Sequence, residues 1–592
     1  MNMRKIYLVS AAMLMTAAVS FGQNFNPTVE VTNTYQGNAS EVHKPLLGMN
    51  VPDSLLRFDL DFDYEVFEKP YQGAYSFKPY MLNMRPAKDA WRGRQLYLKA
   101  GAGYTLHPRF EFVFSPEQSG PFQMSVYASH KSYFGNYHEI KPETGAERRT
   151  LKKTGGAFGG YDALTSAGFD GRYNWENSIL SFGIGYYGLA AKDSVVKRAY
   201  NAVDFNVRAR SNSNEESYFL YDVALRGRIA NDNLDYGSYA FPENKVVDKQ
   251  NECWAVLDGL AGKVFDTRRS LLVGFEGETS SYRSFYDGNL GRVAVVPSYR
   301  FKSGRWDLNL GVRLEFVFKG DASDTLFFSK MSRDKGQIVY PDAHIGFAAG
   351  DNVLLYADAT GGNNLNAYSS QLSSNHHLNP SFLVSREAGM LNSLSDNTVE
   401  TVNARIGVRG NISSVFQFDF NGGVGLYENA LMEAGLFTAG GDLVPALAYS
   451  DYNLIYANAL VGLRTGRVKI DADFRYRGVS FPDNDAMNLG FTLPKYSGGV
   501  RASYDISSRV YAGINVEAAS WRDGKCASVA SEDILDVRVP GYVDLGVNCG
   551  YKFNRKLEFW LESGNLLCQA IQRNPFYAEK GPWVTAGVSL NL

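Results

Sequence analysis

The chain has 592 residues, a length that fits one very large domain or several ordinary ones. Its 60 Lys and Arg balance 62 Asp and Glu, so no basic excess points to nucleic acid or to an anionic membrane surface. The 37 Tyr, 37 Phe and 58 Gly are typical of a sheet-rich membrane protein with aromatic girdles, although a soluble all-β protein can share this composition.

The first 22 residues have the pattern of an export signal. Arg4 and Lys5 provide a short positive region, and residues 6–19 form an apolar run that is too short to span a membrane as a helix. Small residues follow at the spacing that a signal peptidase recognises, which predicts Gln23 as the first mature residue. No later stretch is long and apolar enough for a spanning helix. We therefore predict a Sec signal peptide at 1–22 and no helical membrane anchor.

Residues 23–94 show little periodicity and contain many prolines. Because proline has no backbone N–H and interrupts regular structure, we expect an extended periplasmic or lumen-lying segment here and not a folded domain. The prolines are Pro27, Pro45, Pro52, Pro70, Pro79 and Pro86. An extended segment of this kind is suited to binding a periplasmic or outer-membrane protein, so residues 24–94 are the candidate region for a partner.

From residue 95 onward, apolar and polar residues alternate in segments that end in turns. Successive side chains of a strand point to opposite faces, so this alternation gives each strand one apolar and one polar face. The clearest run has Trp306, Leu308, Leu310, Val312, Leu314, Phe316 and Phe318 on one face and Arg305, Asp307, Asn309, Arg313 and Glu315 on the other. Such segments match the roughly 9–11 residues that a tilted membrane strand needs. Because lipid offers no hydrogen bonds, a sheet of these strands must close on itself.

We count about 22 such segments, which predicts an all-β fold: a transmembrane antiparallel β-barrel without a plug domain over residues 95–592. The segments begin near residues 95, 108, 121, 160, 179, 200, 217, 253, 270, 291, 305, 337, 352, 399, 415, 453, 467, 495, 509, 540, 556 and 582. From the fourth segment onward, short and long connectors are expected to alternate strictly, as periplasmic turns and external loops do. The long connectors are predicted near 131–159, 230–252, 319–336, 361–398, 428–452 and 519–539.

Three stretches carry a resemblance to a known family: residues 96–104 (LYLKAGAGY), 29–32 (VEVT) and 574–577 (NPFY). With the strand count, they resemble TonB-dependent outer-membrane receptors, and specifically the plug-less receptor-like proteins of Bacteroidetes. The resemblance implies a location in the outer membrane of a Gram-negative bacterium, in contact with its lipid. Transporting members of the family carry a plug before the barrel, and residues 23–94 are too few for one. Coupling to TonB is therefore left open.

The polar faces carry charges of both signs. Arg208 is predicted to face Asp222 on the next strand, and Arg405 and Arg409 are predicted to lie near Asp419. A selective pore shows rings of side chains with the same charge, whereas pairs of opposite charge stabilise a water-filled interior. We therefore interpret these residues as a structural network.

Two histidine positions are candidates for chemistry. His376 and His377 are able to chelate a metal, but a solvated pair in the longest loop is the favoured interpretation. His344 lies with Tyr340 and Asp342 on the polar face of one segment, which gives similarly weak support for a site. No Ser, His and Asp lie at a spacing that suggests nucleophilic catalysis. We therefore predict no catalytic, cofactor-binding or metal-binding residues, no cofactor, and a protein that is not an enzyme.

Two functions fit these predictions. The first is a receptor- or transport-like barrel for passage of a solute across the outer membrane, because known transporters with 22 strands enclose a lumen that they keep plugged. The lumen must then be filled by residues 23–94, by loops or by a partner. The alternative is a structural or assembly subunit of a multiprotein outer-membrane complex, which the missing plug and the mixed charges suggest.

Overall fold

The structure is a computed structural model, and it describes residues 95–592 with the exception of 105, 117–119, 144–147, 194–195, 213–216, 238–244, 285–287, 320–338, 379–382, 385–395, 414, 438–442, 483–489 and 529–533. The predicted signal peptide at 1–22 and the predicted extended segment at 23–94 lie outside the described residues. Within the described part of the chain, no helix has the length and apolarity needed to cross a membrane.

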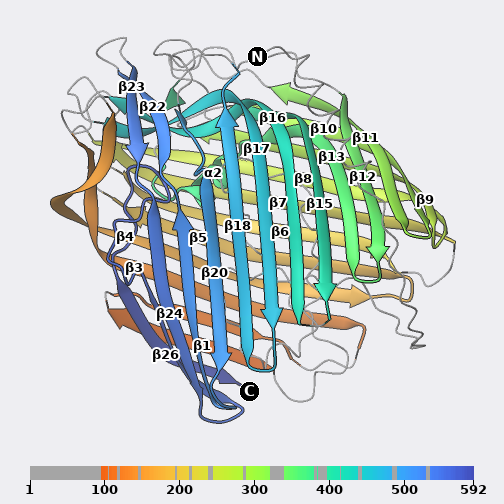
Figure 1. Ribbon diagram of the computed structural model, residues 1–592, viewed down its shortest axis with the longest axis horizontal. Helices are drawn as coiled ribbons and strands as arrows, with labels where there is room; N and C mark the ends of the chain where they lie inside the picture. Colours follow the sequence, from red (N-terminus) through yellow and green to blue (C-terminus); the bar gives the residue numbers. More distant parts are fainter. Residues whose placement is uncertain are drawn as a thin grey trace, which may run out of the picture. The chain divides into compact units, whose positions relative to one another are not determined.

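A closed antiparallel β-barrel of 22 strands forms the body of the structure (Figure 1). In chain order its strands are β1 (Leu96–Tyr104), β2 (Arg109–Phe114), β3 (Phe122–Pro142), β4 (Arg149–Asn174), β5 (Ser178–Lys192), β6 (Val196–Ser211), β7 (Tyr218–Gly237), β8 (Lys245–Asp266), β9 (Arg269–Ser284), β10 (Gly288–Ser303), β11 (Trp306–Lys319), β12 (Val339–Gly350), β13 (Val353–Leu365), β15 (Asn397–Ile412), β16 (Phe416–Phe437), β17 (Leu443–Arg464), β18 (Val468–Ser480), β20 (Tyr496–Asp505), β21 (Val510–Ala519), β24 (Tyr542–Lys552), β25 (Leu557–Gly564) and β26 (Trp583–Asn591). The first strand pairs with the last, with Leu98 opposite Leu590, and this pairing closes the barrel. Each of the 22 predicted segments corresponds to one strand, so the predicted fold class and strand count are confirmed.

The alternation along each strand separates an apolar outer face from a polar inner face. On β11, Phe316 and Phe318 leave 52% and 58% of their surface exposed, whereas Glu315 next to Phe316 is 1% exposed. Large hydrophobic side chains at the surface with charged side chains inside are the reverse of a soluble protein. This reversal is the arrangement expected of a barrel whose outer face contacts lipid.

The predicted connector lengths are wrong in several places. Strand β6 begins four residues after β5 ends, and β10 begins four residues after β9 ends, so two connectors on the long-loop side are short. Conversely, the predicted long loops at 131–159, 230–252 and 428–452 consist largely of paired strand. There the strands continue as long hairpins beyond the alternating segments. The period-two pattern did not reveal them because it arises from contact with lipid on one face only.

Among the described residues, four short strands lie outside the barrel wall: β14 (Leu383–Val384), β19 (Gly490–Phe491), β22 (Arg522–Ser528) and β23 (Ile534–Val539). We call the β22–β23 hairpin, at the upper left of Figure 1, the bridge. Its strand β22 pairs in parallel with the end of β16, and β23 pairs in parallel with the start of β4. Because β4 is the fourth and β16 the fifteenth strand around the wall of 22, the bridge joins opposite sides of the barrel.

An apolar cluster holds the bridge in place. It consists of Leu151, Phe437, Phe491, Cys526, Val537 and Val539, all of which are buried. These residues come from β4, β16, β19 and both strands of the bridge. Burial of these six side chains gives the bridge a hydrophobic core of its own. Burying each large apolar side chain stabilises the structure by roughly 1.5–3 kcal/mol.

Candidate functional site in the barrel lumen

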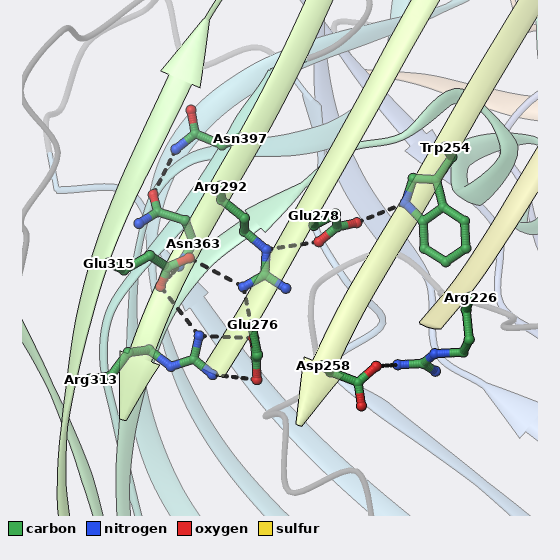
Figure 2. Close-up of polar contacts among 10 residues, drawn as sticks. All are labelled: Arg226, Trp254, Asp258, Glu276, Glu278, Arg292, Arg313, Glu315, Asn363 and Asn397. Carbon is green, nitrogen blue, oxygen red and sulfur yellow. Dashed lines mark hydrogen bonds and ion pairs between the residues drawn. The ribbon is translucent and has the colours of Figure 1, made fainter. Parts of the chain in front are cut away.

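Ion pairs cover the inner wall. Figure 2 shows Arg292 on β10 between carboxylates from both neighbouring strands. Its Nε donates to Glu278 at 2.8 Å, and its Nη1 donates to Glu315 at 3.2 Å. Arg313 on β11 donates to Glu276 at 2.8 Å and to Glu315 at 3.4 Å. Every charge in this group is balanced by at least one neighbour, so the group stiffens the wall.

Two of the three pairings predicted from sequence are present. Arg208 Nε donates to Asp222 at 2.7 Å, and Arg409 Nε donates to Asp419 at 2.8 Å. Arg405, predicted to lie near Asp419, instead donates to Asp358. Because both signs occur side by side along the wall, these residues act as a network that satisfies buried charge, as predicted.

One loop segment enters the lumen and packs against a part of the wall several strands away. We call residues 366–378 the inner segment; it follows β13 and contains the short helix α2 (Tyr368–Ser374). The Tyr368 side chain is completely buried, and its hydroxyl donates to Asp232 on β7. The backbone N–H of Ser369 donates to Glu252 on β8 at 3.1 Å. Since β7 and β8 lie six and five strands away from β13 in the wall of 22, the segment reaches well beyond its neighbouring strands.

Further contacts hold the two ends of the inner segment. The Tyr368 backbone N–H donates to the hydroxyl of Tyr282 on β9 at 3.1 Å. At the other end, the Arg198 guanidinium on β6 donates to the carbonyl oxygen of Leu378. Leu372 is also buried in the cluster that includes Tyr200 and Tyr282. The segment is therefore held by apolar contacts in its middle and by hydrogen bonds at its ends.

The structure places His376 and His377 inside the protein, so the predicted solvated loop pair is wrong. Their side chains are only 26% and 14% exposed. His376 Nδ1 lies 2.9 Å from a carboxylate oxygen of Asp162 on β4. His377 Nδ1 lies 3.7 Å from a carboxylate oxygen of Asp193. Neither histidine is positioned by periodicity, so nothing in the sequence indicated these contacts.

The two histidines differ in their acid–base behaviour. Burial opposes the charged form of His376, but the charge of Asp162 and the hydrogen bond to it outweigh burial and raise the pKa of His376 above its ordinary value. For His377 burial prevails over the attraction of Asp193 and lowers the pKa. The inner segment therefore favours one protonated and one neutral imidazole side by side.

A second loop meets the inner segment. We call residues 565–582 the closing segment; it connects β25 to β26. The hydroxyl of Tyr577 donates to the carbonyl oxygen of His377 at 2.9 Å, and the Asn574 amide donates to the carbonyl oxygen of Ser374 at 3.2 Å. The closing segment also accepts a hydrogen bond from Arg522 of the bridge through the carbonyl oxygen of Gln572, at 3.1 Å. The bridge and the two segments thus form one connected closure.

His344 occupies a different part of the wall. Its Nδ1 forms a hydrogen bond with Asp358, the carboxylate that also pairs with Arg405. These residues and Asp342 line a small hollow on the wall. Tyr340, on the same face of β12 as predicted, accepts a hydrogen bond from the Asn363 amide at 2.9 Å. Among the described residues, no three His, Cys, Asp or Glu side chains are grouped so as to hold a metal ion.

Known structures share this fold. No family model and no curated protein matches the sequence. The outer-membrane ferripyoverdine receptor of Pseudomonas aeruginosa matches 84% of this chain and 72% of its own with a TM-score of 0.60 at 11% identity. The copper transporter OprC matches 84% of this chain and 80% of its own with a TM-score of 0.60 at 12% identity. The ferric-catecholate import receptor Fiu of E. coli K12 matches 84% and 82% with a TM-score of 0.57 at 10% identity.

These similar structures are TonB-dependent receptors. At such low identity the likeness concerns the barrel fold. The described residues therefore define a closed 22-stranded barrel of the type found in outer-membrane receptors.

Proposed function

We propose that the protein is a receptor- or transport-like barrel for passage of a solute across the outer membrane, and that its own loops close the passage. The observation that carries this proposal is the connected closure of the bridge, the inner segment and the closing segment. Barrels of this size enclose a lumen wide enough to breach the membrane unless something fills it. In this chain, loops from within the barrel domain supply that filling.

The contacts that hold the inner segment are of a kind that can be exchanged. They are hydrogen bonds between its backbone and the side chains of Arg198, Glu252 and Tyr577, each worth about 0.5–3 kcal/mol net. A solute that forms similar bonds in their place would release the segment at small net cost. The wall itself is held by continuous strand pairing, so it stays closed while the segment moves.

The location of the protein and its relation to a particular group of receptors are part of the same proposal. We infer an outer-membrane location from the apolar outer face and from the similar receptors. A Sec signal at 1–22, a partner-binding region at 24–94 and kinship with the plug-less receptor-like proteins of Bacteroidetes are parts of this proposal that rest on sequence. The similar structures lend no support to the alternative of a scaffold subunit.

Conductance of the purified full chain in planar bilayers tests the proposal. In one variant, a Gly- and Ser-containing sequence of the same length replaces residues 367–378; we call it the replaced-segment variant. We expect rare, small openings of the natural protein and long, large openings of the replaced-segment variant. Asp258→Asn is the matched control, because Asp258 lies on the same wall and pairs with Arg226 away from the segment. Silent bilayers with both proteins would rule out a loop-closed passage.

A further inference from the structure

We propose that the lumen wall contains a binding site for peptides, and that the inner segment is its tethered occupant. The site lies on the inner faces of β4 and β6 to β9, where the segment docks. A peptide in solution would compete with the segment for this surface. The inference rests on the proposed function, because the segment must leave the wall before a peptide can enter.

The wall recognises the main chain of the segment. Glu252 and the Tyr282 hydroxyl accept hydrogen bonds from two consecutive backbone N–H groups. Arg198 donates to a backbone carbonyl oxygen at the other end. Main-chain groups are common to all peptides, so side chains placed to bind them at both ends of a segment form a site for peptides as a class.

A deep pocket provides an anchor for one side chain. Tyr368 fills it and is completely buried, with Tyr200, Tyr282 and Leu189 in the surrounding apolar cluster. At the bottom, Asp232 accepts the hydrogen bond of the Tyr368 hydroxyl. A buried aromatic side chain with its polar end satisfied is the usual form of an energetic centre in protein–peptide recognition.

The charges around the segment narrow the class of peptide. Four carboxylates contact or face it, and one guanidinium does. The carboxylates are those of Asp162, Asp193, Asp232 and Glu252, and the guanidinium is that of Arg198. Lys131 lies near Asp162 and offsets part of this excess. The wall thus suits a neutral to cationic peptide that presents a tyrosine near its N-terminal end and a cationic or imidazole group further along.

Binding of a labelled peptide by the replaced-segment variant tests the site. The probe is a synthetic peptide with the sequence of residues 367–378, AYSSQLSSNHHL, carrying a fluorophore, and its anisotropy is measured with the full chain in detergent. We expect saturable binding by the replaced-segment variant and much weaker binding by the natural protein, in which the peptide must first displace the inner segment. In the variant background, Asp232→Asn and Glu252→Gln should each weaken binding about tenfold, because a hydrogen bond to a charged acceptor becomes a weaker one to a neutral amide oxygen. Asp258→Asn should leave binding unchanged, and a scrambled peptide should bind poorly.

The outcomes separate this inference from the proposed function. A replaced-segment variant that conducts in bilayers but does not bind the peptide overturns the peptide site and leaves the passage intact. A variant that binds the peptide but stays silent in bilayers supports the site and overturns the passage.

A second measurement covers the case in which the replaced-segment variant does not fold. In the otherwise natural chain, Leu372→Cys places a thiol at a position that is 1% exposed. Excess peptide should displace the segment and raise maleimide labelling at residue 372, read by mass spectrometry. Unchanged labelling at saturating peptide would overturn the proposal.

Discussion

The hydroxyl of Tyr577 donates a hydrogen bond to the carbonyl oxygen of His377, 2.9 Å away, although 200 residues separate them in the chain. The two rings also stack, with 5.0 Å between their centroids. This contact joins a loop between β13 and β15 to the loop between β25 and β26. The two segments therefore hold each other in place, and in the proposed function they close the lumen together.

Tyr577→Phe should loosen the closure without dismantling it. The substitution removes the hydrogen bond and keeps the ring stacking, so the cost is about 1 kcal/mol. We expect roughly a fivefold larger open fraction in single-channel records. Tyr551→Phe on the outer face of β24 is the control and should behave like the natural protein. Equal open fractions for all three proteins would show that the contact plays no part in closure.

Tyr368→Phe should weaken docking of the inner segment through Asp232. The hydroxyl that bonds to this carboxylate is lost, and Asp232 has no exposed surface through which water could replace it. An unsatisfied buried acceptor costs about 1–3 kcal/mol, more than the loss of an exposed hydrogen bond. The readout is labelling of Leu372→Cys, which should become faster in the Phe background. Equal labelling rates with and without Tyr368→Phe would show that this hydrogen bond does not hold the segment.

The barrel strands were predictable from sequence for a physical reason. Lipid on one side and water on the other impose period two on every strand, as Phe316 and Glu315 illustrate. The turns then follow from the ends of the alternating runs. Where strands extend beyond the membrane this constraint ends, and the extensions of β4, β8 and β17 were accordingly missed.

The closure could not be predicted in the same way. His376 contacts Asp162 across 214 residues, and Tyr368 contacts Asp232 across 136. Neither residue belongs to a periodic run, and the sequence alone does not show which wall a loop faces. The bridge was missed for the same reason, since its two strands pair with strands from opposite sides of the barrel. The ion pairs of Arg208 and Arg409 were found because adjacent strands bring their partners together.

Glu315→Ala should destabilise the wall strongly. Its carboxylate has no exposed surface and binds Arg292, Arg313 and the backbone N–H of Asn363. Removing it leaves two guanidinium groups with fewer partners in a buried site, at a cost of about 3–5 kcal/mol. The measurement is the temperature at which the barrel loses its resistance to unfolding in SDS on gels. Asp266→Ala, which breaks an exposed pair with Arg269 in a turn, should leave that temperature unchanged.

Docking of the inner segment should depend on pH through His376. The charge of Asp162 raises the pKa of His376 from 6.5, so the docked state binds the proton more tightly than the released state. The contribution of this pair is therefore complete below pH 6.5 and is lost as the pH rises through the raised pKa. Arg198 and Lys131 also act on His376 and oppose its charge, so the comparison must isolate the titration of this one histidine.

The substitution His376→Asn makes that comparison, since it removes the titration and keeps a polar side chain of similar size. Labelling of Leu372→Cys at about pH 6 should be slower in the chain that keeps His376 than in the chain with the added His376→Asn substitution, and the two rates should converge at high pH. The intrinsic pH dependence of maleimide chemistry cancels in the ratio of the two rates. A ratio that stays constant between about pH 6 and pH 9 would show that the imidazole does not hold the segment through its charge.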